Sequence, residues 1–204
     1  MFELQPSEVK IVEVGPRDGL QNESVSLSLE DKFHYIKLLS LTGLKTIEAT
    51  SFVRADKIPQ MADAVELYKK VHAEFTDGLV SFPCLVPNLK GLELAKSVGV
   101  KEISLFSATS NEFTKKNINC TIDESFHRMK EIYENFEHED IKVRAYISTA
   151  FGCPYSGYMD SKQLMKIVEK FLELGVYEIS IGDTIGVATP KQVYDYIQDI
   201  KSVV

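Results

Sequence analysis

The stretch Val12-Glu13-Val14-Gly15-Pro16-Arg17-Asp18-Gly19-Leu20-Gln21-Asn22-Glu23 constrains the fold more than any other part of the sequence. It begins within an apolar run that predicts a strand, and Gly15-Pro16 predicts a tight turn directly after that strand. The turn carries Arg17 and Asp18 where an open doubly wound sheet usually has a glycine-rich phosphate loop. Charged side chains at the end of a strand favour a (β/α)₈ barrel, because a barrel gathers its polar groups on that rim.

Six apolar runs, of which this strand is the first, recur at a mean spacing of about 34 residues. They are short and rich in Val, Ile, Phe and Tyr, and stretches with helical periodicity separate them. Regular alternation of strands and helices predicts a parallel sheet with helices outside it. An open doubly wound sheet and a (β/α)₈ barrel both fit this spacing, and the charged strand ends favour the barrel. The predicted strands are Val9–Val14, Thr46–Thr50, Leu79–Val86, Glu102–Ser107, Val143–Thr149 and Tyr177–Ile181.

The length predicts one domain over residues 1–204, because no linker or low-complexity tract divides the sequence. Eight strand-helix units at the same spacing would need about 272 residues, in line with the roughly 250 residues of a closed barrel. The chain therefore corresponds to about six of the eight units. Two units of the complete fold, strands seven and eight with their helices, are expected to be missing.

Helix starts are marked by polar residues at fixed offsets. Ser28 with Asp31, and Thr121 with Glu124, fit the capping-box pattern. Thr189-Pro190 combines a capping residue with a proline at the first helical position. These pairs predict helices that begin directly after them.

Composition and charge narrow the classes of function. The 204 residues are 44% hydrophobic and carry a formal net charge of −7, which indicates a folded globular protein. The acidic balance argues against nucleic acid as the main partner, and no run of about 18 apolar residues predicts a membrane span. The three cysteines are well separated and no signal-like leader opens the sequence, so we expect a cytoplasmic protein.

The charged residues at two strand ends are candidate catalytic or ligand-binding residues. Of the adjacent Arg17 and Asp18, which we expect to point in different directions, one can bind an oxyanion while the other holds a cation. The alternative is an exposed ion pair in a loop, which stabilises little. Glu48 lies in an apolar strand, where a carboxylate needs a partner, and Arg17 is the natural one. The alternative is that this ion pair is purely structural. Glu13, a carboxylate in the first predicted strand, has the same two interpretations.

Polar residues also mark the later strands. Arg144, Tyr146 and Ser148 alternate with apolar residues, so they share one face of their strand, and the interior of a barrel is the favoured environment. Asp183 closes the last strand between glycines, either as a site residue or as a cap of the next loop. Lys115-Lys116-Asn117 forms a basic spot suited to a phosphate group, or else a solvated loop.

Beyond these physical arguments, the sequence resembles the hydroxymethylglutaryl-CoA lyase family, which belongs to the metal-dependent lyase and aldolase barrel superfamily. The resemblance runs from about Val9 to the end of the sequence and rests on several long strings in the right order. Besides Val12–Glu23, the strings are Ile47-Glu48-Ala49-Thr50-Ser51-Phe52-Val53, Pro87-Asn88-Leu89-Lys90-Gly91, Phe113-Thr114-Lys115-Lys116-Asn117-Ile118-Asn119, Gly152-Cys153-Pro154-Tyr155 and Ile179-Ser180-Ile181-Gly182-Asp183-Thr184-Ile185-Gly186.

The resemblance implies a retro-Claisen cleavage of 3-hydroxy-3-methylglutaryl-CoA to acetyl-CoA and acetoacetate, a reaction of leucine degradation and ketone-body formation. It implies a divalent cation, Mg²⁺ or Mn²⁺, as cofactor, with coenzyme A as part of the substrate. The implied partner is therefore a small CoA thioester, with no nucleic acid and no membrane, and a homodimer is one candidate assembly.

The resemblance also implies a role for each candidate residue. Asp18 would be a metal ligand, and Arg17 would bind the thioester oxygen and stabilise the enolate. Glu48 would orient Arg17, and Asp183 would take part in proton transfer, with Glu13 grouped with these catalytic residues. The implied substrate-binding residues are Arg17, Gln21, Lys115, Lys116, Asn117, Arg144, Tyr146 and Ser148.

One departure from the family pattern concerns the metal site. The family also uses a His-x-His pair and a later Asn as ligands, and a reactive Cys in a glycine-rich loop, whereas this sequence contains no His-x-His. We therefore expect the 204-residue chain alone to be inactive or nearly so. The alternatives are a related aldolase or acyltransferase on the same barrel, and a non-catalytic truncated barrel that acts in binding or assembly.

Overall fold

The structure, a computed structural model, describes residues 7–136 and 139–203. The chain divides into two compact units. The N-terminal unit runs to Leu85 and includes Leu94–Val100, and the C-terminal unit consists of Val86–Glu93 and the chain from Lys101 onward. Helix α3 (Leu89–Ser97) contributes residues to both.

The strands of the N-terminal unit are short and parallel. β1 (Val12–Glu13) pairs with β2 (Thr46–Ile47), and β3 (Thr50–Ser51) pairs with β4 (Cys84–Leu85). Between β2 and β3, the Glu48 amide donates to the Glu13 carbonyl at 2.8 Å and the Ala49 amide donates to the Pro83 carbonyl at 3.0 Å. The segment that carries Glu48 therefore lies between β1 on one side and the chain leading into β4 on the other.

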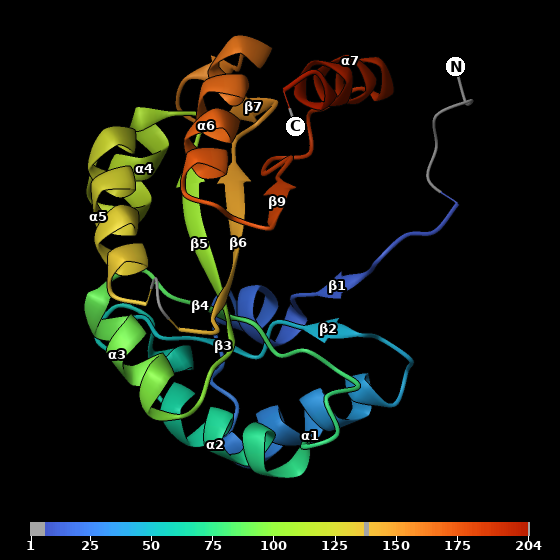
Figure 1. Ribbon diagram of the computed structural model, residues 1–204, viewed down its shortest axis with the longest axis vertical. Coiled ribbons are helices and arrows are strands. Elements are labelled where there is room, and N and C mark those ends of the chain that lie inside the picture. The colour runs from blue at the N-terminus through green and yellow to red at the C-terminus, as the bar shows by residue number, and fades with distance from the viewer. Residues whose placement is uncertain (1–6, 137–138, 204) are drawn as a thin grey trace. The chain divides into compact units, whose positions relative to one another are not determined.

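Two helices cover this unit. α1 (Leu29–Ser40) begins after Ser28, whose side chain accepts the Asp31 amide as predicted, and α2 (Ala64–Glu74) contacts α1 (Figure 1). Lys32 on α1 is 3% exposed, and its ammonium group donates to the Asp63 carboxylate at 2.7 Å and to the Gln60 carbonyl. These two contacts tie α1 to the turn that precedes α2.

The C-terminal unit contains a parallel sheet of three strands, β5 (Glu102–Ala108), β6 (Lys142–Ser148) and β9 (Glu178–Ile181). Residues at matching positions of neighbouring strands share a face. On one face the residues contributed by β6 and β9 are polar and include Arg144, Tyr146, Ser148 and Glu178. The predicted shared face of the β6 residues is therefore confirmed.

Helices pack on this sheet and extend beyond it. α4 and α5 contact β5, α6 contacts β6, and α7 contacts α6 (Figure 1). Thr121 and Glu124 form both hydrogen bonds of the predicted capping box, and the Thr189 side chain accepts the Gln192 amide at the start of α7. The bounds are α4 Asn111–Ile118, α5 Ile122–Glu134, α6 Ser161–Glu173 and α7 Pro190–Lys201, with an antiparallel hairpin of β7 (Gly152–Cys153) and β8 (Gly157–Tyr158).

The predicted strand 46–50 is divided into β2 and β3, and two other predicted strands are shorter than expected. Of the run 9–14, only Val12–Glu13 is paired, and of the run 79–86, only Cys84–Leu85 forms a strand, with a single bridge from Ser81 to Thr46. Pro83 interrupts the second run because proline has no amide hydrogen to donate to a neighbouring strand. The apolar runs in the sequence therefore predict longer strands than the structure forms.

Candidate active site

The turn after β1 is a single π-type turn over Gly15–Gly19. The Val14 carbonyl accepts the amides of Arg17 at 3.1 Å and Asp18 at 2.7 Å. Pro16 occupies the start of the turn, where its missing amide hydrogen leaves no donor unsatisfied. The Gly-Pro pair thus builds a rigid turn that presents Arg17 and Asp18 at the end of a strand.

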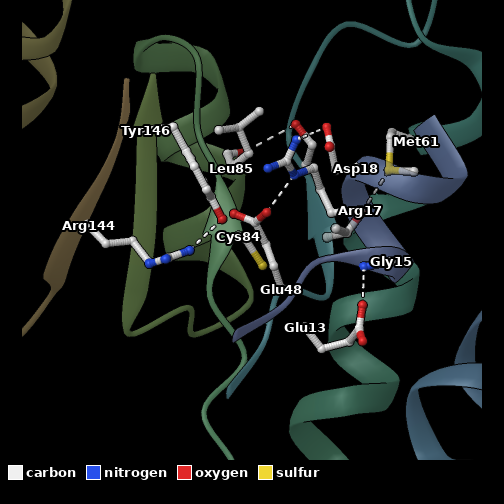
Figure 2. Close-up of polar contacts among 12 residues, drawn as sticks. Glu13, Gly15, Arg17, Asp18, Glu48, Met61, Cys84, Leu85, Arg144 and Tyr146 are labelled. Atoms are coloured by element: carbon white, nitrogen blue, oxygen red, sulfur yellow. Dashed lines mark hydrogen bonds and ion pairs between the residues drawn. The ribbon is translucent and has the colours of Figure 1, made fainter. Parts of the chain in front are cut away.

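Arg17 is held by two carboxylates (Figure 2). Its Nε donates to Glu48 Oε2 at 2.5 Å, and its Nη1 donates to Asp18 Oδ1 at 2.6 Å. Arg17 is 7% exposed and Glu48 is fully buried, whereas the Asp18 side chain is 54% exposed. The predicted Arg17–Glu48 ion pair is confirmed. The expectation that Arg17 and Asp18 point in different directions is wrong, because the turn folds the guanidinium back onto Asp18.

This arrangement fixes the guanidinium in two directions. A buried carboxylate is costly unless it is paired, so Glu48 requires Arg17, and Arg17 in turn gains a fixed orientation. Asp18 adds a second contact from the solvent side. A cation that does not reorganise is the kind of group that stabilises negative charge on a substrate oxygen.

Glu13 supports the turn itself. Its Oε1 accepts the Gly15 amide at 2.6 Å. Burial raises the pKa of the Tyr35 phenol, and the nearby Glu13 carboxylate raises it further by a smaller amount. A Cβ on Gly15 would lie 2.5 Å from Tyr35 Oη and 2.9 Å from Glu13 Oε1, so glycine is needed here for space. The catalytic role of Glu13 stays a prediction, and the observed contacts are with the turn.

Gln21 follows the same turn and is partly buried. Its Oε1 is one of the few buried side-chain atoms without a hydrogen-bond partner among the described residues. Leaving such an acceptor unsatisfied costs about 1–3 kcal/mol. A ligand or water that donates to Gln21 would remove this cost, which supports its predicted place in substrate binding.

In the C-terminal unit, Arg144 and Tyr146 are connected. Arg144 is 2% exposed, its Nε and Nη2 donate to Glu178 Oε1 at 2.9 and 2.6 Å, and its Nη1 donates to the Tyr146 hydroxyl (Figure 2). Ser148 lies further along the same face and is partly buried. Sequence reasoning missed Glu178, because its contact with Arg144 follows from the register of β6 and β9.

Asp183 organises the loop after β9. Its carboxylate accepts the amides of Val187 at 3.1 Å and Ala188 at 3.0 Å. These bonds match the loop-capping alternative, and a role for Asp183 in proton transfer stays a prediction.

The rim beside Asp183 contains a strained residue. Thr149 has a φ of +58°, which is costly for a β-branched residue. Its amide donates to Thr184 Oγ1 at 2.7 Å, and its carbonyl accepts from Thr109 Oγ1 at 2.6 Å. The ends of β5 and β6 and the loop after β9 are thus joined at this point. No feature of the sequence predicts this conformation.

Lys115, Lys116 and Asn117 lie in α4, not in a loop. The Lys116 ammonium group lies 3.8 Å from the centroid of the Tyr155 ring, and Asn117 Nδ2 donates to the Phe113 carbonyl at 3.1 Å. Both lysines are in the last turn of the helix, where positive charge is favourable. Their exposure leaves them accessible to a phosphate group.

Cys153 in the hairpin is 2% exposed. Its Sγ donates to Ser110 Oγ at 3.2 Å and accepts the Tyr155 amide at 3.4 Å. Burial alone raises the pKa of this thiol, but hydrogen bonds between the thiol and Ser110, Tyr155 and Ser156 outweigh it, so the pKa lies below its ordinary value. The thiol is nevertheless enclosed rather than presented at the surface.

The described residues do not by themselves form a site for a divalent cation. No group of three or more His, Cys, Asp and Glu side chains among them could hold a metal ion. Asp18 offers carboxylate oxygen, the ligand type that hard cations prefer, but one of its oxygens is bound to Arg17. Asp18 can therefore serve as one ligand, and this part of the chain supplies no full coordination sphere.

The profile of the family described as HMGL-like matches residues 8–204. The chain belongs to the HMGL-like family. The hydroxymethylglutaryl-CoA lyase named mitochondrial from Macaca fascicularis is 48% identical over 195 residues, which cover 96% of this chain and 59% of the relative. The chain thus spans about three-fifths of that relative's length, and the names of further relatives include cytoplasmic lyases.

Two solved structures of HMGL-like relatives show the same fold. The hydroxymethylglutaryl-CoA lyase from Pseudomonas aeruginosa matches with a TM-score of 0.92 and 41% identity, over 98% of this chain and 65% of that one. An HMG-CoA lyase from Acinetobacter baumannii, in complex with coenzyme A and 3-methylmalate, matches with a TM-score of 0.89 and 31% identity, over 96% of this chain and 63% of that one. The predicted α/β fold of the (β/α)₈-barrel type, present over part of its length, is confirmed.

In the described part of the chain, no helix combines the length and apolar character needed to cross a bilayer.

Proposed function

We propose that this chain carries part of the site of a 3-hydroxy-3-methylglutaryl-CoA lyase, with Arg17 as the group that stabilises charge on the thioester. The observation that carries the proposal is the buried Arg17–Glu48 ion pair at the ends of β1 and β2, with Asp18 at its exposed side. Family membership and the coenzyme A complex of the A. baumannii relative support it.

The proposed reaction balances without an oxidant or reductant. The substrate's tertiary hydroxyl loses its proton to a base and becomes the ketone of acetoacetate as the adjacent C–C bond breaks. The electron pair of that bond passes into the thioester enolate, which then takes a proton to give acetyl-CoA. Arg17 would donate hydrogen bonds to the enolate oxygen, where negative charge develops. Glu48 would keep the guanidinium aimed at that oxygen.

Other residues would bind the remaining parts of the substrate. Lys115 and Lys116 on α4 would contact phosphates of coenzyme A, with Asn117 beside them. Gln21 Oε1 would accept a hydrogen bond from the acyl portion. Asp18 would be one ligand of Mg²⁺ or Mn²⁺, which when bound polarises the substrate hydroxyl.

Binding of an analogue of 3-hydroxy-3-methylglutaryl-CoA in which a methylene group replaces the thioester sulfur, so that the carbonyl oxygen is kept, tests the proposal. We expect calorimetry to detect binding to the chain and Arg17→Gln to weaken it at least tenfold, because the acyl oxygen loses its charged donor. Arg54→Gln is the matched control, since Arg54 is an exposed arginine paired with Asp56 in the same unit. Equal loss in both variants, or no binding to the unaltered chain, contradicts the proposal.

Turnover by the 204-residue chain alone is expected to be very low, because Asp18 by itself provides too few ligands to bind a divalent cation tightly. A coupled assay for acetoacetate in the presence of Mg²⁺ or Mn²⁺ measures this turnover. A rate near that of a full-length relative, such as the lyase from P. aeruginosa, would contradict the expectation. Loss of weak Mn²⁺ binding in Asp18→Asn, but not in Asp56→Asn, would support Asp18 as a ligand. The homodimer and the cytoplasmic location stay predictions.

A further inference from the structure

The hairpin of β7 and β8 places an aromatic ring against α4. The turn of the hairpin carries Tyr155, whose ring centroid lies 6.3 Å from that of Phe113 on α4. The Tyr155 amide donates to Cys153 Sγ at 3.4 Å, and the neighbouring Ser156 hydroxyl donates to Glu112 Oε2 on α4 at 2.8 Å. The turn is therefore bound both to its own hairpin and to the helix, and Tyr155 has a fixed place beside α4.

Lys116 meets the same ring. It lies three residues after Phe113, so the two side chains share one face of α4. Its ammonium group lies 3.8 Å from the centroid of the Tyr155 ring, well within the range of about 6 Å for a cation–π interaction. In the described part of the chain, Lys116 forms no ion pair. Both side chains are exposed, so the ammonium keeps N–H donors that a ligand can reach.

The adjacent Lys115 has different surroundings. Hydrogen bonds from its own amide and from two serine hydroxyls lower the pKa of Glu112, and the charge of Lys115 lowers it by a smaller amount. Hydrogen bonds from Thr121 lower the pKa of Glu124, again with a small contribution from Lys115. The charge of Lys115 is therefore partly compensated by two carboxylates, whereas the charge of Lys116 faces an aromatic ring.

We propose that Tyr155 is a positioning residue that holds the Lys116 ammonium group in place for a phosphate of coenzyme A. The proposal rests on the proposed lyase function, and it makes Lys116 the stronger phosphate contact of the two lysines. A long lysine side chain loses rotamer freedom when its ammonium binds a phosphate. A ring that has already ordered the side chain lowers this cost, although Tyr155 itself touches no ligand.

A double-mutant cycle on the full chain tests the proposal, with coenzyme A as the probe and calorimetry as the measurement. We expect Lys116→Gln to weaken binding about tenfold, because a charge-assisted hydrogen bond is lost. Tyr155→Leu should weaken it about fivefold, because the ammonium is no longer held. In the Lys116→Gln background, Tyr155→Leu should change the affinity less than about twofold, because no ammonium is left to position.

The chain offers matched controls for both positions. Tyr155→Phe keeps the ring and should bind coenzyme A within about twofold of the unaltered chain. Lys115→Gln removes the same charge one residue earlier and should weaken binding less than about threefold. Tyr158→Leu removes the other exposed tyrosine of the hairpin and should leave binding unchanged. Should Tyr155→Leu not fold, Tyr155→Met keeps an apolar side chain against Phe113 without a ring, and the same loss is expected.

A purely structural role of Tyr155 predicts a different result. Tyr155→Leu would then weaken binding equally with and without the Lys116 ammonium, and that outcome overturns the inference. No binding of coenzyme A to the unaltered chain, or its displacement by inorganic phosphate at equal concentration, also overturns it.

The outcomes separate this inference from the proposed function. If Arg17→Gln weakens binding of the acyl analogue but Tyr155→Leu leaves coenzyme A binding unchanged, the inference falls and the lyase function stands. If the double-mutant cycle shows the expected coupling but Arg17→Gln leaves binding of the acyl analogue unchanged, the lyase function fails and the positioning of Lys116 by Tyr155 stands.

Discussion

Arg17 Nε donates to Glu48 Oε2 at 2.5 Å, and this contact joins the turn after β1 to the segment between β2 and β3. Both side chains are buried, so neither charge can be hydrated if the other is removed. The contact therefore links the stability of the N-terminal unit to the geometry of the candidate active site. Changes to it should be visible in unfolding measurements even when no substrate is present.

Glu48→Gln should lower the free energy of unfolding by about 3 kcal/mol, because it removes the buried carboxylate charge that the buried Arg17 guanidinium binds. Urea unfolding measures the change. Glu93→Gln removes the same charge from the exposed Lys90–Glu93 pair and should cost less than about 0.5 kcal/mol. A similar small loss in both variants would show that the Arg17–Glu48 pair is energetically unimportant.

Gly15→Ala should destabilise the chain by about 1–3 kcal/mol, since the new methyl group would overlap Tyr35 Oη. Gly19→Ala in the same turn meets no atom within 4 Å and should be close to neutral. Adding Tyr35→Phe to Gly15→Ala removes the clashing oxygen and should restore part of the loss. Absence of any rescue in the double variant would mean that the cost arises elsewhere, for instance at Glu13.

Asn119 ends α4, the helix that carries the lysines expected at coenzyme A, in the left-handed conformation with φ of +50°. Asn119→Ala should cost about 1 kcal/mol, because a Cβ without a compensating side-chain hydrogen bond disfavours this conformation. Asn119→Gly adopts it without strain and should be nearly neutral. Thermal unfolding of the two variants compares them, and an equal shift would rule out backbone strain as the cause.

The sequence alone predicts the main elements because their signals are local. Apolar runs identify β5, β6 and β9, and the Thr121–Glu124 pair marks the start of α5. The Arg17–Glu48 pair is predictable for a physical reason: a carboxylate in an apolar strand needs a cation, and one lies at the end of the preceding strand. Partners fixed by such necessity can be found without a structure.

The missed features depend on information that is not local. α4 has Phe113 and Thr114 as its buried residues, so its periodicity is too brief to detect. The Arg144–Glu178 contact follows from the register of two strands separated by a helix, and register is set by packing of the whole sheet. The positive φ of Thr149 has no signature at all in a β-branched residue.

Tyr177 gives a pH-dependent prediction. Burial, followed by its hydrogen bond to the Glu102 carboxylate, raises the pKa of Tyr177 above its ordinary value near 10. The folded state therefore favours the neutral phenol, and the unfolded state loses its proton first as the pH rises. The stability that Tyr177 contributes is fully present below about pH 10 and is lost as the pH rises through the folded-state pKa.

Tyr177→Phe should accordingly be less stable than the unaltered chain at pH 8, and the difference should shrink between pH 10 and pH 11. Urea unfolding at these pH values gives the difference, in which the titration of all other groups cancels because they are common to both proteins. Tyr194→Phe, on the exposed part of α7, controls for loss of a phenol hydroxyl. A difference that stays constant up to pH 11 would mean that the Tyr177 hydroxyl contributes through packing and not through its bond to Glu102.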